Sequence, residues 1–253
     1  MEKQPRISII TVVRNDQEHI DATIRSVLDQ TYDNIQYIII DGASTDGTTG
    51  KIAGYGNKIN VFITEPDQGI YDAMNKGIGI ATGEYLLFLN SGDRLYETGT
   101  LQKIFSMDPA DIYYGETAYY DSQDHYLGIR SEVTTRVLPA RLNDRHFLMG
   151  MPVAHQSFII RKEISSQFNT RFNCSADIDW CIQSLKYAKK VVNTGFVISK
   201  YLVGGHSHRN RRTCWKERFV ILKNHFGPVP AILAQLRIIF RYFYKYLLLG
   251  RRY

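Results

Sequence analysis

Apolar runs alternate with amphipathic segments along roughly the first 95 residues. Short runs rich in β-branched residues, each bounded by polar residues, predict four buried strands, over 7–13, 35–41, 60–67 and 84–90. Apolar residues between these runs recur at helical spacing and predict helices over 18–30 and 69–83, and turn residues at 42–47 precede another helix start. Strands and helices that alternate in this way indicate a parallel sheet covered by helices on both faces.

The pattern changes after Asp93. Helices are expected over 98–105 and 175–190, and β segments over 111–120, 125–130, 153–161 and 191–205. The expected fold is therefore an α/β fold of Rossmann type, with a mostly parallel central sheet and helices on both faces.

Polar residues follow each of the four predicted strands. They are Asn15 and Asp16, Asp41, Asp67, and Asp93. In open α/β sheets, ligands bind outside the carboxyl ends of the strands. We therefore expect these side chains to share one rim, where a ligand binds.

The composition is that of an ordinary globular protein: 253 residues, 44% hydrophobic and 22% charged. The first residues lack the pattern of a signal peptide, and an odd number of cysteines, three, argues against a disulfide framework. A cytoplasmic location is therefore expected. Residues 209–253 hold eleven Lys and Arg but only one acid, Glu217, which predicts an anionic surface as a partner of the tail.

Known phosphate-binding motifs are missing from the chain. The segment after the first predicted strand reads RNDQEH, not G-x-G-x-x-G, and no P-loop sequence occurs. A rim lined by carboxylates suits a nucleotide whose diphosphate binds through a divalent cation, because the cation bridges acid and phosphate.

Several motifs then resemble a known family: SIITVVRN, IIIDGASTDGT, EPDQGIYDAMNKGIGIATGEYLLFLNSGD and SADIDW. Over roughly residues 5–205 they are similar to family 2 glycosyltransferases with the GT-A fold, and most similar to bacterial exopolysaccharide enzymes of the colanic-acid fucosyltransferase type. The resemblance implies a UDP- or GDP-linked sugar as donor, a divalent cation (Mg²⁺ or Mn²⁺), and transfer to an acceptor hydroxyl with inversion.

The resemblance divides the chain into a GT-A catalytic domain, 1–205, and a basic segment, 206–253. Within the domain, 1–95 would bind the nucleotide and 96–205 would form the acceptor side. In surface polysaccharide biosynthesis the acceptor would be a glycan, or more specifically a lipid-linked oligosaccharide.

Nucleotide-binding residues follow from the same motifs. Asp41 takes the place of the family's first acid, which accepts a hydrogen bond from the base, whereas the second acid is replaced by Gly42. Thr11 and Asn15 would hold the nucleoside. In NSGD, the family's metal motif, Asp93 is the only acid and becomes the metal ligand, with Asn90 or Ser91 on ribose or water.

The general base is expected in SADIDW. Asp177 matches the second residue of the family's Glu-Asp motif, while Ala176 replaces the first, and Asp179 remains the alternative. Either acid could instead simply favour the start of a helix.

Further candidates lie on both sides of the rim. Asp67 and Asp72 could face the donor sugar and Lys76 a phosphate, whereas His155 and Gln156 occur where similar enzymes contact the acceptor. For Tyr71, a stacking platform and core packing are both open.

The tail repeats Arg237, Arg241 and Lys245 at every fourth position among apolar residues. On a helix they form a basic stripe, which favours an amphipathic helix on the inner face of the cytoplasmic membrane. A helix packed on the catalytic domain, or at a dimer interface, is the alternative. Nucleic acid is not expected as a partner. The missing acids leave a catalytically silent nucleotide-sugar-binding module as the alternative function.

Overall fold

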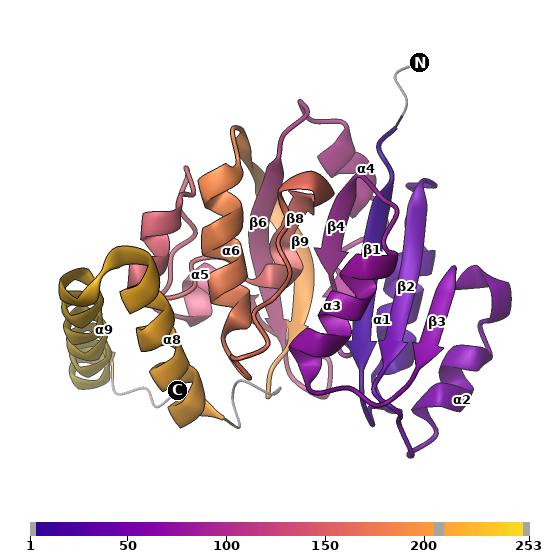
Figure 1. Ribbon diagram of the computed structural model, residues 1–253, viewed down its shortest axis with the longest axis horizontal. Coiled ribbons are helices and arrows are strands. Elements are labelled where there is room, and N and C mark those ends of the chain that lie inside the picture. Colours follow the sequence, from indigo (N-terminus) through magenta and orange to yellow (C-terminus); the bar gives the residue numbers. More distant parts are fainter. Residues whose placement is uncertain (1–3, 205–209, 250–253) are drawn as a thin grey trace.

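The structure is a computed structural model that describes residues 4–204 and 210–249. One sheet runs through the molecule, with helices packed against both of its faces (Figure 1). The strands of the described residues are β1 (Ile7–Val13), β2 (Ile35–Asp41), β3 (Val61–Thr64), β4 (Tyr85–Phe88), β5 (Arg94–Leu95), β6 (Ile112–Tyr120), β7 (Tyr126–Ile129), β8 (Phe158–Arg161) and β9 (Val191–Leu202). The main helices are α1 (Ile20–Leu28), α2 (Thr48–Ala53), α3 (Ile70–Ile80), α4 (Thr100–Phe105), α5 (Arg130–Val133), α6 (Ala176–Tyr187), α8 (Arg211–Phe226) and α9 (Pro228–Leu249).

The sheet has a parallel half and a mixed half. Its order is β3-β2-β1-β4-β8-β6-β9-β5, with β7 paired to β6. The first four strands are parallel, as the alternating pattern predicts. β8 is antiparallel to both β4 and β6, and β5 is antiparallel to β9, whereas β6 and β9 are parallel. The expected α/β fold is confirmed, but the sheet is less parallel than predicted, because every strand after β4 forms at least one antiparallel pair.

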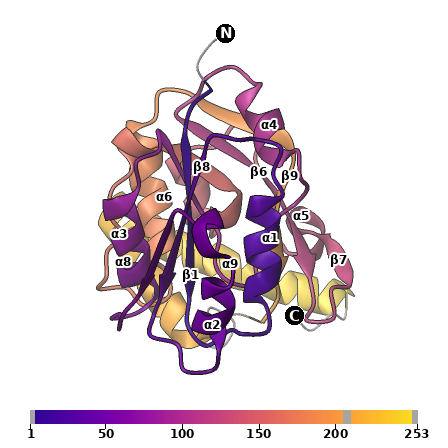
Figure 2. The same ribbon diagram turned by 90° about the vertical axis from the view of Figure 1, so that its right-hand side faces the viewer.

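Both faces of the sheet are buried, which accounts for the continuous apolar runs. Alternate residues such as Ile10, Ile38 and Phe88 pack with α3 and α6, while their neighbours, such as Ile9 and Ile39, pack with α1 and α4. Figure 2 shows α3, α6 and α8 on one side of the strands and α1 and α4 on the other.

The direction of β8 is what assembles the site. Because β8 runs antiparallel to β4, its first residues lie beside the last residues of β4. A short 3₁₀ helix, η3 (His155–Ser157), enters β8 at that point. Two segments separated by about sixty positions in sequence therefore meet at the carboxyl edge of the parallel strands.

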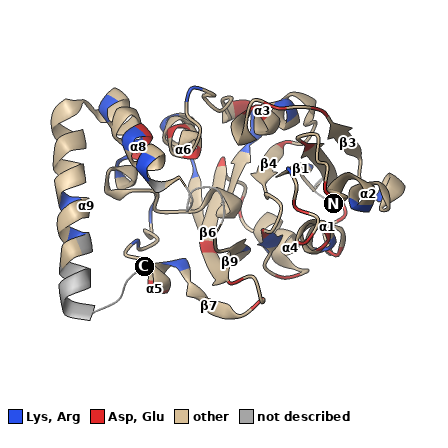
Figure 3. Cartoon of the chain, turned by 90° about the horizontal axis from the view of Figure 1, so that it is seen from below, with Lys and Arg blue, Asp and Glu red and all other residues tan. Residues whose placement is uncertain are grey.

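The tail forms two helices that belong to the same body (Figure 3). Ile221 and Leu222 of α8, and Ala231 and Ala234 of α9, are buried in the core that also contains α6. The predicted domain boundary at 205 falls outside the described residues. Within the described ranges, no helix combines the length and apolar character that crossing a membrane requires.

Glu217, the only acid of the tail, binds the start of α6. Its carboxylate accepts hydrogen bonds from the backbone N–H groups of Asn173, Cys174 and Ser175 at 2.8–3.0 Å. These three residues immediately precede α6, which begins at Ala176, so the carboxylate holds the backbone that leads into the helix.

Two glycines of α3 give a matched test of its packing on β1. A side chain at Gly77 would place its Cβ 2.4 Å from Ile10 Cγ2, whereas nothing lies within 4 Å at Gly79. We expect Gly77→Ala to lower the free energy of unfolding by about 1–3 kcal/mol through overpacking. Gly79→Ala should raise it by about 0.5–1 kcal/mol, because alanine favours a helix. Urea unfolding of both variants checks the prediction, and equal effects would contradict it.

Candidate active site

Asp93 is buried at the end of β4, with only 4% of its surface exposed. Gln156 Nε2 donates to its Oδ2 at 2.6 Å, and the backbone N–H of Leu202 donates to Oδ1 at 3.2 Å. Burial raises the pKa of this carboxyl from its ordinary 3.8 to about 6, although both hydrogen bonds and the nearby His155 lower it. The predicted metal ligand and the predicted Gln156 are therefore direct partners.

His155 connects the end of β4 to the start of α6. Its Nε2 lies 3.3 Å from Asn90 Nδ2, and its Nδ1 lies 3.3 Å from Asp177 Oδ2. If the Asn90 side-chain amide donates to Nε2, a neutral His155 ring carries its proton on Nδ1. The Nδ1–H group then donates a hydrogen bond to Asp177. Asn90 Oδ1 is then buried without a hydrogen-bond partner in the described structure. A buried amide oxygen in this position is open to a ligand or a cation.

Asp177 lies in the first turn of α6 and is held from two sides. The hydroxyl of Tyr71 donates to its Oδ1 at 3.3 Å, opposite the contact with His155. Burial raises the pKa of the Tyr71 phenol strongly, and the negative charge of Asp177 raises it further. Tyr71 therefore stays protonated as a donor to the carboxylate. Its ring also stacks on Phe168, 5.5 Å between centroids, so Tyr71 is packed in the core and holds Asp177 at the same time.

Asp179 is excluded from the same position by its own contacts. His225 Nε2 of α8 lies 2.6 Å from Asp179 Oδ1, and Gln183 Nε2 donates to Oδ2 at 2.9 Å. Asp179 thus attaches α8 to α6, while Asp177 faces His155. Of the two carboxylates considered from sequence, Asp177 is the one that His155 links to Asn90.

Asp41 is fully buried and its oxygens are already occupied. They accept hydrogen bonds from the Ser44 backbone and hydroxyl and from the hydroxyls of Thr49 and Thr64. Asn15, in a left-handed conformation, accepts from the Thr45 N–H at 2.8 Å. These bonds shape the loop after β2. The sequence predicts that Asp41 accepts a hydrogen bond from the nucleotide base. Such a contact would require one of these hydroxyl groups to release its hydrogen bond to Asp41.

Thr11 and Lys76 also have internal partners. Thr11 is fully buried, and its hydroxyl pairs with Tyr37 at 3.1 Å, inside the sheet. Lys76 Nζ binds Glu65 at 2.8 Å and lies 3.6 Å from Asp72, so it fastens the segment before α3. The structure does not bring these two predicted nucleotide contacts, or Asp72, to Asp93.

Asp67 fills the space above Gly42. A Cβ built on Gly42 would lie 2.2 Å from Asp67 Oδ2, while Asp67 Oδ1 accepts from the Gly69 N–H at 3.0 Å. Where the family carries a second acid after the β2 strand, this chain has glycine, and the carboxylate above it comes from the next loop. Asp67 thus presents an acid at the end of β2 and β3.

Asp16 is a site residue that the sequence placed on the rim but did not assign a role. Ser91 Oγ donates to Asp16 Oδ2 at 2.7 Å, and the negative charge of Asp16 contributes to the raised pKa of Asp93. His19 Nδ1 pairs with Oδ1 at 2.5 Å, leaving His19 Nε2 buried without a partner in the described residues. The position of Asp16 after β1 resembles those of Asp41 and Asp93 at the ends of other strands. This position was the signal in the sequence that could have identified Asp16 as a site residue.

The oxygen donors at the end of β4 fit a divalent cation shared with a ligand. Asp93 supplies one carboxylate and Asn90 an unpaired amide oxygen, both ligands that Mg²⁺ and Mn²⁺ accept. Among the described residues, no three His, Cys, Asp or Glu side chains form a cage for a metal. Magnesium in proteins is often held by one or two carboxylates together with phosphate oxygens, and these two residues match that arrangement.

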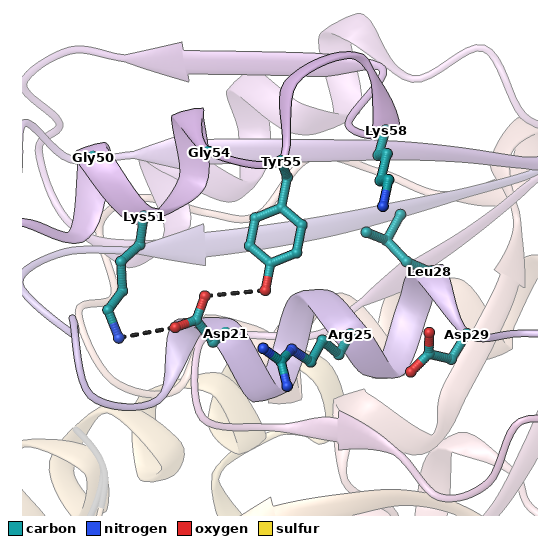
Figure 4. A pocket seen from close by; sticks show the side chains of 9 residues that line it. All are labelled: Asp21, Arg25, Leu28, Asp29, Gly50, Lys51, Gly54, Tyr55 and Lys58. Atoms are coloured by element: carbon teal, nitrogen blue, oxygen red, sulfur yellow. Dashed lines mark hydrogen bonds and ion pairs between the residues drawn. The ribbon is translucent and has the colours of Figure 1, made fainter.

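A cavity of about 880 Å³ lies elsewhere, between α1 and α2 (Figure 4). Its charged groups neutralise one another: Asp21 accepts from Lys51 at 2.8 Å and from the Tyr55 hydroxyl at 3.0 Å. None of the predicted site residues lines it.

The parallel strands place acids at their carboxyl edge, where His155 links Asp177 to Asn90. The sequence profile described as "Glycosyl transferase family 2" matches residues 8–168. The chain therefore belongs to glycosyl transferase family 2, and it is a glycosyltransferase. The predicted family and enzyme class are confirmed.

Two named relatives have related sequences. The "PGL/p-HBAD biosynthesis glycosyltransferase" of Mycobacterium bovis (strain BCG / Pasteur 1173P2) is 29% identical over 189 residues, 71% of this chain and 69% of its own. The "Putative teichuronic acid biosynthesis glycosyltransferase TuaG" of Bacillus subtilis (strain 168) is 37% identical over 94 residues, 36% of this chain and 37% of its own.

Solved structures share the fold. S. aureus TarS 1-349 in complex with UDP-GlcNAc superposes with a TM-score of 0.66 at 15% identity, covering 97% of this chain and 76% of its own. The mannosyltransferase PcManGT from Pyrobaculum calidifontis, in complex with GDP-Man and Mn²⁺, gives 0.65 at 16% identity, covering 98% and 71%. At these identities the similarity establishes the fold alone.

Because the pKa of Asp93 is raised, we predict that Asp93→Asn increases the free energy of unfolding by an amount that depends on pH. The folded protein binds this proton more tightly than the unfolded chain, so the contribution of Asp93 to stability is lost as pH rises from about 4 through about 6. Above pH 6 the buried charge is a cost that asparagine removes. We expect the free energy of unfolding of Asp93→Asn to exceed that of wild type by on the order of 1–3 kcal/mol between pH 5 and pH 8, with the larger difference at pH 8. Urea unfolding with EDTA present measures it.

Asp46→Asn is the control. A hydrogen bond from Thr48 lowers the pKa of the Asp46 carboxyl, so this acid stays ionised at pH 5 and pH 8. Its effect on stability should be the same at both values. A difference between wild type and Asp93→Asn that did not change with pH would contradict the assignment of a raised pKa.

Proposed function

We propose that the protein transfers a sugar from a nucleoside-diphosphate sugar to an acceptor hydroxyl with inversion at the anomeric carbon. The convergence of Asp93, Asn90 and Asp177 around His155 supports this assignment most strongly. One side of this group offers oxygen donors to a cation, and the other offers a carboxylate to a proton.

Asp177 acts as general base in this proposal. The acceptor oxygen forms a bond to the anomeric carbon while its proton passes to the Asp177 carboxylate. The bond from the anomeric carbon to the diphosphate oxygen breaks, and its electron pair leaves with the nucleoside diphosphate. Tyr71 and His155 donate to the same carboxylate at 3.3 Å each and fix its orientation toward the acceptor. Orientation by neighbouring donors preserves the geometry that proton transfer needs.

A divalent cation, Mg²⁺ or Mn²⁺, would be held by Asp93 and Asn90 Oδ1 and would offset the negative charge of the leaving diphosphate. The complex of PcManGT with GDP-Man and Mn²⁺ supports this cofactor. Ser91 and Asp16, joined at 2.7 Å, would face the ribose or bound water beside it.

The donor base is either uracil or guanine, since the neighbours were solved with UDP-GlcNAc and with GDP-Man. On the loop after β3, Asp67 Oδ1 accepts from the Gly69 N–H and Oδ2 lies over Gly42, whereas both oxygens of Asp41 accept hydrogen bonds. We therefore assign the nucleoside side of the site to Asn15 and Asp67, with Asp41 shaping the loop beneath them.

Asp177→Asn should abolish turnover without abolishing nucleotide binding. The amide cannot accept the proton, and we expect a loss of about 10²–10⁴ in kcat. Donors are first screened by thermal stabilisation with and without Mn²⁺, and transfer is then measured by nucleoside diphosphate release.

Asp179→Asn is the matched control, because it lies in the same helix turn but binds His225. It should keep its kcat and lose stability instead. Equal loss of turnover in both variants would contradict the role of Asp177, and a wild type that binds donors but transfers none would favour a catalytically silent module.

Attachment to an anionic membrane is proposed for α9, with a lipid-linked oligosaccharide as acceptor. Apolar residues at 229, 232, 233, 236, 240 and 243 lie on one arc of roughly 100° and are 50–73% exposed. The buried Ala231 and Ala234 lie on the other side of the helix. Arg237 is exposed beside this apolar stripe, whereas Arg241 turns inward to the Met149 carbonyl at 3.1 Å. The side chain of Lys245 lies outside the described residues. Arg237 and Arg241, which the sequence places in one basic stripe, therefore have different surroundings: the first faces solvent and the second binds the protein.

The double variant Leu233→Ser, Leu236→Ser should bind vesicles less well. Fully burying each leucine contributes about 1.5–3 kcal/mol, so retention on phosphatidylglycerol vesicles should fall by at least about tenfold. Tyr187→Ser, at an equally exposed residue on α6, is the control and should bind like wild type. Unchanged retention of the double variant would overturn the proposal.

A further inference from the structure

Four arginines from distant parts of the chain gather beneath α9. They are Arg130 of α5, Arg136 of the loop that follows, Arg218 of α8 and Arg241 of α9. Arg130 and Arg218 are more than nine-tenths buried. Burial lowers the pKa of the Arg136 guanidinium to about 9, and the positive charges of the other three arginines lower it as well.

This arginine cluster has no acidic partner in the described part of the chain. Arg130 donates to the backbone carbonyls of Pro152, at 2.6 Å, and Met151, and Arg241 donates to the Met149 carbonyl. None of the four forms an ion pair there. Arg218 Nε is buried without any hydrogen-bond partner among these residues. Uncompensated buried charge is costly for a protein, so the cluster calls for an anion that the chain does not itself supply.

A cavity of about 480 Å³ opens beside the cluster. Arg136, Arg145, His146 and Arg241 line it, together with Asn143 and the backbone of Gly150. The Arg136 guanidinium lies so close to Gly150 that an added Cβ would be 3.3 Å from its Nε. Unlike the cavity between α1 and α2, in which Asp21 neutralises Lys51, this cavity presents cations alone among its charged lining residues.

Two tyrosines in tilted contact lie between the cluster and the proposed catalytic acids. Tyr119 of β6 and Tyr201 of β9 pair in register, with ring centroids 5.1 Å apart. Burial raises the pKa of the Tyr201 phenol, and the carboxylates of Asp93 and Asp177 raise it further, while Arg130 lowers it. The pKa of the Tyr201 phenol therefore depends on both proposed catalytic acids and on Arg130 of the cluster. Apart from Arg241, the residues that line the cavity belong to the part of the chain expected to form the acceptor side, 96–205.

We propose that this cavity binds a phosphate or diphosphate group of the acceptor, with Arg136 and Arg241 as its principal ligands. Guanidinium groups bind phosphate oxygens through paired hydrogen bonds, which makes clustered arginines a preferred phosphate site. An anion there neutralises charge that otherwise destabilises the fold. The role in acceptor binding rests on the proposed function, but binding of the anion does not depend on it.

Inorganic pyrophosphate in EDTA is the direct probe, with thermal stabilisation as the readout. Without a divalent cation the donor site is disfavoured for pyrophosphate. Arg136→Gln should weaken the apparent affinity by about tenfold or more, and Asp93→Asn should leave it unchanged. Arg171→Gln, at an exposed arginine away from the cavity, is the matched control.

Arg136→Gln should also raise the unfolding temperature without pyrophosphate, by at least about 2 °C, because it removes an uncompensated charge. An arginine with a purely structural role would lower that temperature instead. Pyrophosphate affinity of Arg136→Gln equal to that of wild type, or lost equally in Arg171→Gln, would overturn the proposal.

Vesicles distinguish a lipid-borne phosphate from a free one. Retention on phosphatidylcholine vesicles that contain phosphatidic acid, a phosphate monoester, should fall in Arg136→Gln if the group is carried by a lipid. If only the pyrophosphate arm responds, the site takes a soluble phosphate. UDP binding with Mn²⁺, measured in parallel, should survive in Arg136→Gln, so failure of the donor assignment is separate from failure of this site.

Discussion

The antiparallel insertion of β8 between β4 and β6 is the constraint on which the site depends. A parallel strand in that place would start at the far edge of the sheet, about a strand length from Asp93. Because β8 runs the other way, His155 and Gln156 enter beside Asn90 and Asp93, and each finds a polar partner there. The reversal in strand direction, and not the parallel half alone, is what brings residues 155 and 156 to residues 90 and 93.

Packing beneath the site fixes α6, the helix that carries Asp177. Trp180 of α6 is buried against Phe88, Phe158 and Phe168, with ring centroids 5.0–5.5 Å apart. Phe168 in turn stacks on Tyr71, so β4, β8, α3 and α6 share one aromatic cluster. Such close packing tolerates little displacement. The distances from Asp177 to Tyr71 and His155 are therefore consequences of the core, not of the polar contacts alone.

Much of this arrangement could be predicted from sequence, because strand periodicity and residues at strand ends are local signals. The rim position of Asp93 follows from that logic, whereas Asp177 was expected near it only because SADIDW resembles the family's Glu-Asp motif. The hydrogen bonds that occupy the Asp41 oxygens could not be predicted, because two of the donors, Thr49 and Thr64, come from other segments of the chain. Asp67 above Gly42 and the arginine cluster depend in the same way on tertiary contacts. Helix α8 lacks a strong apolar stripe, and the pattern of hydrophobic positions did not reveal it.

Glu217 links the tail to the segment that precedes Asp177. Three backbone amides at the start of α6 have this carboxylate as their acceptor, and Asp177 follows two residues later. Without the Glu217 carboxylate, these three amides would lose their acceptor just before the residue proposed as base. The tail therefore helps to fix the backbone that leads into α6.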